Sequence, residues 1–342
     1  MRANMLPTED FERDPSAFTD RVTSDGRYGR VAEPGRYRLV VSRACPWAHR
    51  VVMVRRIMGL EEAISLAVVD PLQEVIDGEP HWVFSEGNGD RDGKDPVLGI
   101  HALREAYLAR DPHYTGGVSV PALVDVATGE LVSNDYDMLS VDLATEWGDL
   151  AREGAPSLYP ELLREEIDTV SAWIHRDLNH GVYRAGFAPD QEVYEDAVSN
   201  VFSRLGYLER RLAGHRYLVS DHITLADLRL WATLVRFDAV YHGHFKCNRR
   251  KLSEYPVLWA YARDLYQTPG FGDTTDLLHI REHYYYVHTG INPSRIVAVG
   301  PDPYGWEEPH YREALNGEPF RGDTPPDPVP ENERVTDLEF QG

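Results

Sequence analysis

The chain has 342 residues, enough for two domains with a sizeable core, and only two are cysteine, too few for a disulfide framework. A formal net charge of -21 at pH 7 disfavours nucleic acid and anionic membranes as partners. The apolar stretches are too short to span a membrane and no targeting segment is evident, so we expect a cytoplasmic protein.

The first half of the chain predicts an α/β domain. Residues 1–36 are polar and are expected to form an N-terminal arm, followed by a domain over 37–155. The predicted elements, in chain order, are a strand at 37–42, a helix at 46–59, a strand at 64–69, a polar insertion at about 77–99, a helix at 101–110, a hairpin over 118–132 and a helix to about 147. This order is typical of the thioredoxin-like fold.

The second half has helical periodicity. Residues 156–300 predict an all-α domain, in which residues 224–227 (TLAD) resemble a capping-box variant at a helix start. Residues 301–342 are rich in proline and acidic residues and predict an extended, partly disordered tail.

Cys45 lies between the first predicted strand and a helix that opens at Pro46, a residue favoured at the first helical position. The unpaired amides and the positive dipole end of a helix start favour a thiolate over a thiol. Cys45 is therefore a candidate nucleophile. The alternative is a small buried structural residue, the common state of a free cysteine.

The sequence around Cys45 contains no resolving cysteine. Ala48 occupies the position that would complete a Cys-x-x-Cys pair. A disulfide of Cys45 must therefore form with another molecule or with the distant Cys247. A one-cysteine mechanism with an external thiol is the simpler hypothesis.

Six short segments spread over both predicted domains carry a family resemblance. They are 45–50 (CPWAHR), 181–188 (GVYRAGFA), 236–241 (RFDAVY), 244–248 (HFKCN), 264–267 (DLYQ) and 279–285 (HIREHYY). Together they resemble the glutathionyl-hydroquinone reductases, the Xi class of glutathione transferases, from about residue 11 to about residue 300.

This resemblance implies a thiol-dependent redox reaction. The cysteine thiolate attacks the sulfur of a thioether between a low-molecular-weight thiol and a hydroquinone, releases the hydroquinone and leaves a mixed disulfide. A second thiol molecule then regenerates the cysteine. The resemblance further implies a homodimer.

The resemblance also assigns residues to the two parts of the site. Val120 and Pro121 match a Val-Pro pair whose proline is cis and whose valine backbone binds the thiol. The implied thiol-binding set also contains Pro46, Trp47 and Trp82, and the implied hydroquinone-pocket set contains Tyr183, Tyr284 and Tyr285, whose hydroxyls can supply a proton. Cys247 is expected in a helical segment, with a structural role.

One segment departs from the family pattern. The family's γ-glutamyl-binding element reads Ser-Asn-Glu-Ser, whereas residues 133–136 read Ser-Asn-Asp-Tyr. Asp135 shortens the carboxylate arm, and Tyr136 fills space that a glutamyl carboxylate would need. We therefore expect mycothiol, which has no γ-glutamyl group and carries a sugar and inositol, to be the thiol, with glutathione and γ-glutamylcysteine as alternatives.

Two other functions stay open at this point. A conjugating transferase or dehalogenase would need a thiol activator near Cys45, for which Ser42 is the available residue. A non-catalytic thiol-binding protein would have an unreactive, buried Cys45. No metal site is predicted, because the paired histidines, such as His279 with His283, lack accompanying ligands.

Overall fold

A computed structural model describes residues 11, 15–320 and 325–335 of the chain. The described residues divide into two compact units. The first contains 15–155 and 326–334, and the second contains 11, 156–320, 325 and 335. Each unit is considered by itself.

A four-stranded mixed sheet forms the centre of the first unit. Its strands, in spatial order, are β2 (Ile64–Val68), β1 (Tyr37–Val41), β5 (Ala122–Asp125) and β6 (Leu131–Ser133). β1 pairs in parallel with β2 and antiparallel with β5, so that Leu39 lies between Leu66 and Leu123. All five residues of β1 are buried, as expected for a strand in the interior of a sheet whose two faces are covered.

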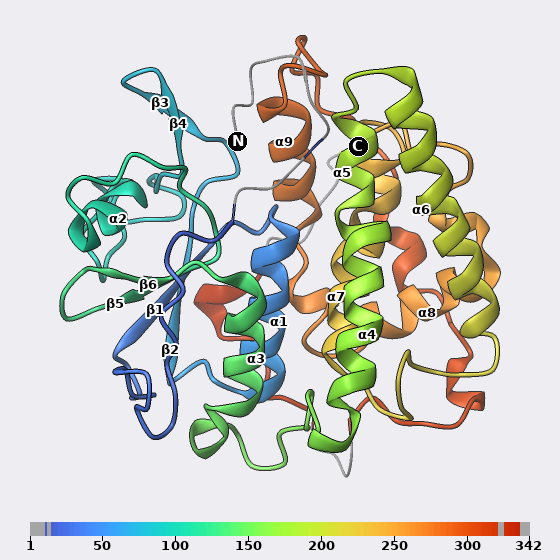
Figure 1. Cartoon of the computed structure of the whole chain (residues 1–342), viewed down its shortest axis with the longest axis horizontal. Coiled ribbons are helices and arrows are strands. Elements are labelled where there is room, and N and C mark those ends of the chain that lie inside the picture. The colour runs from blue at the N-terminus through green and yellow to red at the C-terminus, as the bar shows by residue number, and fades with distance from the viewer. Residues whose placement is uncertain (1–10, 12–14, 321–324, 336–342) are drawn as a thin grey trace. The chain divides into compact units, whose positions relative to one another are not determined.

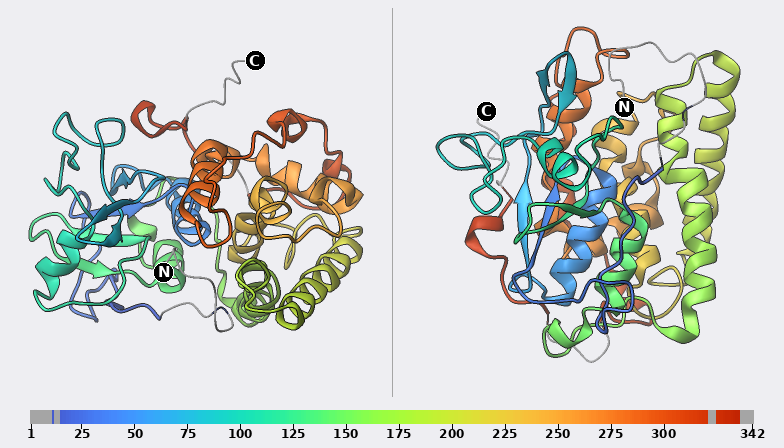
Figure 2. Two further views of the ribbon diagram at one scale, coloured as in Figure 1. Left: turned by 90° about the horizontal axis from the view of Figure 1, so that it is seen from above. Right: turned by 60° about the vertical axis from the view of Figure 1, so that its left-hand side comes forward.

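Helices cover both faces of this sheet. α1 (Pro46–Met58) and α3 (Tyr136–Thr145) lie on one face and α2 (Arg104–Arg110) on the other (Figure 1). Both views in Figure 2 show α1, in blue, beside α3, in green. This arrangement confirms the predicted thioredoxin-like fold.

A small hairpin was not predicted. β3 (Glu74–Ile76) and β4 (Glu79–His81) pair antiparallel around a turn at Asp77 and Gly78, both of which have positive φ. Each strand has only three residues and its side chains are largely exposed, so the sequence carries no apolar alternation from which to recognise it.

The second unit is helical, as predicted. Its helices are α4 (Arg164–Ile174), α5 (Gly181–Gly186), α6 (Gln191–Arg211), α7 (Leu225–Arg236), α8 (Pro256–Tyr266) and α9 (Leu277–Val287). A π-turn at His175–Asn179 joins α4 to α5, and Figure 1 shows the two helices as one column with α6 alongside. A second π-turn, Phe237–Tyr241, extends α7.

The predicted capping box is present at the start of α7. The Asp227 carboxylate accepts a hydrogen bond from the backbone amide of Thr224 at 2.9 Å. Tyr261 donates its hydroxyl to the same carboxylate at 2.7 Å. Asp227 is fully buried, so these donors compensate for the desolvation of its carboxylate.

The described part of the tail makes contacts within each unit. Within the second unit, the Trp306 ring lies 4.6 Å from that of Trp259. Within the first unit, the side chain of Glu333 pairs with Arg55 of α1. The tail also forms 3-10 turns at Pro303–Glu307, Arg312–Ala314 and Glu331–Glu333, so it is not simply extended. No helix among the described residues is both long and apolar enough to cross a membrane.

Candidate functional site

Cys45 is the N-cap residue of α1 and follows β1 across a short loop. Its backbone is extended, with φ -75° and ψ 119°, and Pro46 occupies the first turn of the helix. The carbonyl of Cys45 accepts the first helical hydrogen bond from His49 at 3.0 Å. Its side chain is partly exposed, in contrast to the buried residues on either side. The thiol therefore stands at the open amide end of a helix, as predicted.

The Val120–Pro121 peptide lies against the thiol. Its bond is cis, as the family resemblance implied. The Cys45 Sγ lies 3.5 Å from the Val120 carbonyl oxygen, which places the strand that begins at Ala122 next to the start of α1. Both residues are buried beside the partly exposed Cys45. Sequence segments 75 residues apart thus form one surface around the sulfur.

The start of α3 is capped by the side chain of Asp135. Its Oδ1 accepts hydrogen bonds from the backbone amides of Asp137 and Met138, both at 3.2 Å. A second carboxylate, that of Asp137, lies in the first turn of the same helix. The amides that could hold an incoming carboxylate are therefore already engaged by one from the chain itself.

The starts of α1 and α3 are joined by a stack of three side chains. The rings of Trp47 and Tyr136 lie 5.2 Å apart. The guanidinium of Arg50 lies 5.0 Å from the Trp47 ring and 4.9 Å from the Tyr136 ring, and its Nη1 is 3.4 Å from Asp137. The structure therefore brings Cys45, Trp47, Asp135 and Tyr136 to the same end of the first unit. Arg50 was noted from the sequence as a residue after the nucleophile that could contribute charge or packing, but its position between Trp47 and Tyr136 was not predicted.

Trp82 is buried and lies directly after β4. Its backbone carbonyl accepts a hydrogen bond from Leu103 at 2.9 Å, which ties it to the segment before α2. Contact of Trp82 with a bound thiol stays a prediction.

Two of the three predicted pocket tyrosines meet in the second unit. The hydroxyls of Tyr183 on α5 and Tyr284 on α9 are in direct hydrogen-bond contact. The Tyr241 hydroxyl lies 3.0 Å from the same Tyr284 oxygen. Burial, with Tyr183 and Tyr241 as neighbours, raises the pKa of Tyr284 well above its usual value. The Tyr284 hydroxyl therefore stays protonated and can act as a donor.

Tyr285 points elsewhere. Its hydroxyl is 3.5 Å from the Ala239 carbonyl, and its ring centroid is 4.7 Å from that of His244. Adjacent residues on a helix project about 100° apart, so the two side chains leave α9 in different directions, although both hydroxyls reach the turn Phe237–Tyr241. Tyr285 therefore lies outside the hydrogen-bonded group of Tyr183, Tyr284 and Tyr241, and its place in a hydroquinone pocket stays a prediction.

Aromatic neighbours of Tyr183 and Tyr284 were missed from the sequence. Tyr241 is fully buried. The Phe11 ring stacks on Tyr183 at 5.4 Å with an interplanar angle of 23°. The His288 ring lies 5.3 Å from Tyr284. These three residues are far apart in the chain. Of them, only Tyr241 lies in one of the six family-like segments, so the sequence offered no reason to group them.

Cys247 was expected in a helical segment, and this prediction is wrong. It lies in an irregular segment after the turn that follows Tyr241. Its side chain is fully buried, and burial raises the pKa of its thiol to about 12. A structural role fits this environment.

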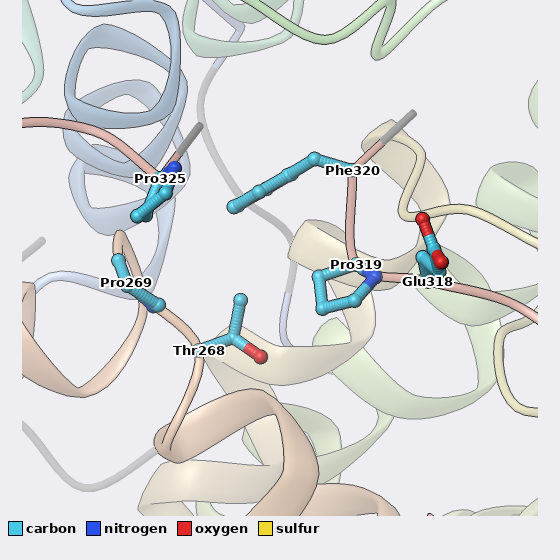
Figure 3. Close-up of a pocket in the computed structure, with 6 residues that line it drawn as sticks. All are labelled: Thr268, Pro269, Glu318, Pro319, Phe320 and Pro325. Atoms are coloured by element: carbon cyan, nitrogen blue, oxygen red, sulfur yellow. The ribbon is translucent and has the colours of Figure 1, made fainter. Parts of the chain in front are cut away.

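A hollow of about 270 Å³ in the second unit contains none of the predicted site residues. It is lined by Thr268, Pro269, Glu318, Pro319, Phe320 and Pro325 (Figure 3). The described residues include no group of three or more His, Cys, Asp or Glu side chains that could hold a metal ion. Ser42, the activator that a conjugating transferase would need, is fully buried.

Comparisons with known proteins point to one superfamily. The sequence profile of the glutathione S-transferase C-terminal domain matches residues 191–264. The chain is 42% identical over 316 residues to glutathionyl-hydroquinone reductase YqjG of Escherichia coli, with 90% of this chain and 93% of that protein covered. The crystal structure of a glutathione transferase from Gordonia bronchialis has a TM-score of 0.89 and 54% identity, covering 93% and 97% of the two chains. An Xi-class glutathione transferase from Natrialba magadii has a TM-score of 0.83 and 41% identity, covering 92% and 97%.

Proposed function

The chain belongs to the Xi class of glutathione transferases, the glutathionyl-hydroquinone reductases, and from this premise we propose that it reductively cleaves thioether conjugates of hydroquinones. The observation that carries the proposal is the position of Cys45, partly exposed at the start of α1 beside the Val120 carbonyl. A cytoplasmic location and a homodimeric state belong to the same proposal.

Cys45 is the nucleophile of the proposed reaction. Its thiolate attacks the thioether sulfur and forms a disulfide bond with it. The carbon–sulfur bond breaks, and its electron pair stays with the ring carbon, which takes a proton to become the free hydroquinone. The ring carbon is thereby reduced, while the two sulfur atoms are oxidised to the disulfide.

An external thiol completes the cycle. A second thiol molecule attacks the mixed disulfide, leaves as a symmetrical disulfide and returns Cys45 as a thiolate. Cys247 is a poor internal substitute because it is fully buried and its thiol pKa is raised to about 12. Only a thiolate attacks a disulfide at a useful rate.

The proton that the ring carbon takes is assigned to the tyrosines of the second unit. The Tyr183 and Tyr284 hydroxyls form a hydrogen-bonded pair. Burial keeps Tyr284 protonated by raising its pKa. A positioned phenol can donate a proton as a carbon–sulfur bond breaks. The Tyr285 hydroxyl contacts the Ala239 carbonyl instead, so its place in the wall of the hydroquinone pocket rests on the family resemblance alone.

The test of this function is Cys45→Ser. This variant is expected to abolish hydroquinone release from a thiol–hydroquinone conjugate, whereas Cys247→Ser serves as a matched control that keeps activity. Mass spectrometry of the wild type during turnover should show one thiol attached at Cys45. Full activity of Cys45→Ser would refute the mechanism.

The start of α3 supports mycothiol as the thiol. The Asp135 carboxylate already accepts from the amides of Asp137 and Met138, where a glutamyl carboxylate would have to bind. Asp135 and Asp137 place two carboxylates there, of which Arg50 pairs with the second, so the Asp135 charge still disfavours a further carboxylate. Sugar and inositol hydroxyls can instead donate to these carboxylates. Pro46, Trp47, Trp82, Val120, Pro121 and Tyr136 complete the proposed thiol site.

Thiol identity can be measured directly. One hydroquinone is conjugated in turn to mycothiol, γ-glutamylcysteine and glutathione, and kcat/KM is determined for each conjugate with the matching free thiol. We expect the mycothiol pair to give the highest value. Turnover of the glutathione pair at the same rate would end the preference for mycothiol and leave the reductase function intact.

A further inference from the structure

Tyr241 has no role in the reaction as described so far, yet its hydroxyl reaches the proposed proton donors. It lies 3.0 Å from the Tyr284 oxygen, which in turn contacts the Tyr183 hydroxyl. The three hydroxyls therefore form a chain with Tyr284 in the middle. Residues from α5, α9 and the π-turn after α7 supply its members.

Differences in burial distinguish the two ends of this series of three hydroxyls. Tyr241 is fully buried, Tyr284 is 1% exposed and Tyr183 is 6% exposed. Tyr183 is the most exposed of the three residues, and we assign it to the side that meets the substrate. Tyr183 is therefore the member best placed to give up a proton, and Tyr241 is the member furthest from any substrate.

The ring of Tyr241 is fixed by its neighbours. It stacks on Phe245 at 5.4 Å with an interplanar angle of 24°, and meets the edge of the Tyr284 ring at 5.7 Å. Its backbone belongs to the π-turn Phe237–Tyr241, which adds one residue to the helical turn and rotates the following side chain. A second π-turn, His175–Asn179, precedes Tyr183 on its own helix.

We propose that Tyr241 is a positioning residue that donates to Tyr284 and so directs the Tyr284 proton toward Tyr183. The Tyr284 hydroxyl carries one proton, so it can donate to only one of its two neighbours while it accepts from the other. With Tyr241 as the donor, Tyr284 donates outward. This inference rests on the proposed function and assigns the order in which its tyrosines act.

The order has a consequence for the bond-breaking step. As the carbon–sulfur bond breaks, Tyr183 transfers its proton to the ring carbon and becomes a phenolate. The phenolate oxygen then accepts from Tyr284, which accepts from Tyr241, and such a chain stabilises the new charge more than one hydrogen bond does. The second thiol molecule supplies the proton that restores Tyr183, so atoms and charge balance over the cycle.

The test is Tyr241→Phe, which removes the hydroxyl and keeps the ring. We expect kcat to fall about five- to tenfold, the loss expected for one hydrogen bond, with KM within about twofold of the wild type. The alkaline limb of the kcat profile should move to higher pH, because the Tyr183 phenolate loses support, while the acidic limb stays in place. The charge of Arg236, at the end of α7, opposes the rise that burial causes in the pKa of Tyr284 and is present in both proteins, so it does not account for the difference. A purely structural role would not move one limb alone.

The matched control is Tyr217→Phe. Tyr217 is equally buried in the same unit, and its hydroxyl has no hydrogen-bond partner among the described residues. This variant should keep the wild-type kcat and pH profile. Tyr284→Phe breaks the chain at its middle and should reproduce the shifted alkaline limb, which provides a second test if Tyr241→Phe is poorly folded.

The outcomes separate this inference from the proposed function. A wild type that releases no hydroquinone overturns both. An active wild type whose Tyr241→Phe and Tyr284→Phe variants match it in kcat and pH profile overturns the assigned order and leaves the reductase function standing. A rise in KM alone also contradicts a role in proton transfer.

Discussion

Glu333 and Arg55 face each other through two N–O distances of 2.7 Å, although 278 residues separate them in the chain. The Arg55 side chain is 1% exposed and that of Glu333 is 13% exposed. The Glu333 backbone carbonyl also accepts from Arg43 at 2.7 Å, two residues before Cys45. The end of the described chain is thus tied to the helix and the loop that carry the proposed nucleophile.

Loss of this tie should destabilise the protein. Glu333→Ala leaves the Arg55 charge buried without its carboxylate, and we expect the free energy of unfolding to fall by about 3 kcal/mol. Glu331→Ala, at an exposed position two residues earlier, should change it little. Urea unfolding of the full chain measures both. Identical urea midpoints for Glu333→Ala and the wild type would show that the Arg55–Glu333 pair contributes nothing to stability.

The two cysteines should react very differently with iodoacetamide. Cys45 is partly exposed, whereas Cys247 is fully buried and has a thiol pKa raised to about 12. Alkylation of the native protein should therefore add one group, at Cys45, and urea should expose Cys247 to a second. Peptide mass spectrometry locates the label. Early modification of Cys247 in the folded protein would contradict the buried environment.

The segment at the start of α3 should control thiol choice. Asp135→Glu with Tyr136→Ser restores the family's Ser-Asn-Glu-Ser element, and we expect the ratio of glutathione to mycothiol kcat/KM to rise about tenfold, since one gained charge-assisted contact has roughly that value. Asp149→Glu makes the same acidic change at an exposed site and should leave the ratio unaltered. An unchanged ratio in the double variant would remove this segment as the determinant.

Stability should decline in mild acid because of a buried histidine pair. His244 and His288 lie ring on ring, with a nitrogen of each 3.2 Å apart. Burial, and then the charges of Lys246 and His283, lower the pKa of His244 to about 4, and burial lowers that of His288 as well. In the unfolded chain these histidines have an ordinary pKa of about 6.5 and take up protons below that pH, whereas in the folded protein they stay neutral. The free energy of unfolding therefore decreases as the pH falls from about 6.5 toward 4.

The size of the expected loss in unfolding free energy follows from the lowered pKa of His244. A depression from 6.5 to about 4 corresponds to about 3 kcal/mol by pH 4, of which about 2 kcal/mol is lost by pH 5. Urea midpoints at pH 7 and pH 5 measure it. His244→Gln should reduce the difference between the two pH values, and His215→Gln, at an exposed position, should not. An equal difference in all three proteins would contradict the prediction.

Local sequence was enough for much of the first unit. The apolar run that became β1 and the proline that opens α1 placed Cys45 at a helix start, because strand burial and helix initiation depend on neighbouring residues. The capping box at Thr224 and Asp227 was visible for the same reason. By contrast, the hairpin of β3 and β4 has short exposed strands and gave no periodic signal.

The sequence by itself determined a thioredoxin-like domain, a helical domain and a cysteine at the mouth of a helix, since each depends on residues within a few positions of one another. Only the tertiary structure decided that Tyr241 joins Tyr183 and Tyr284, that Tyr285 contacts Ala239 instead, and that Glu333 pairs with Arg55. The two residues of each contact are between 43 and 278 positions apart in the chain. Packing of whole helices brings them together, and no local pattern encodes that packing.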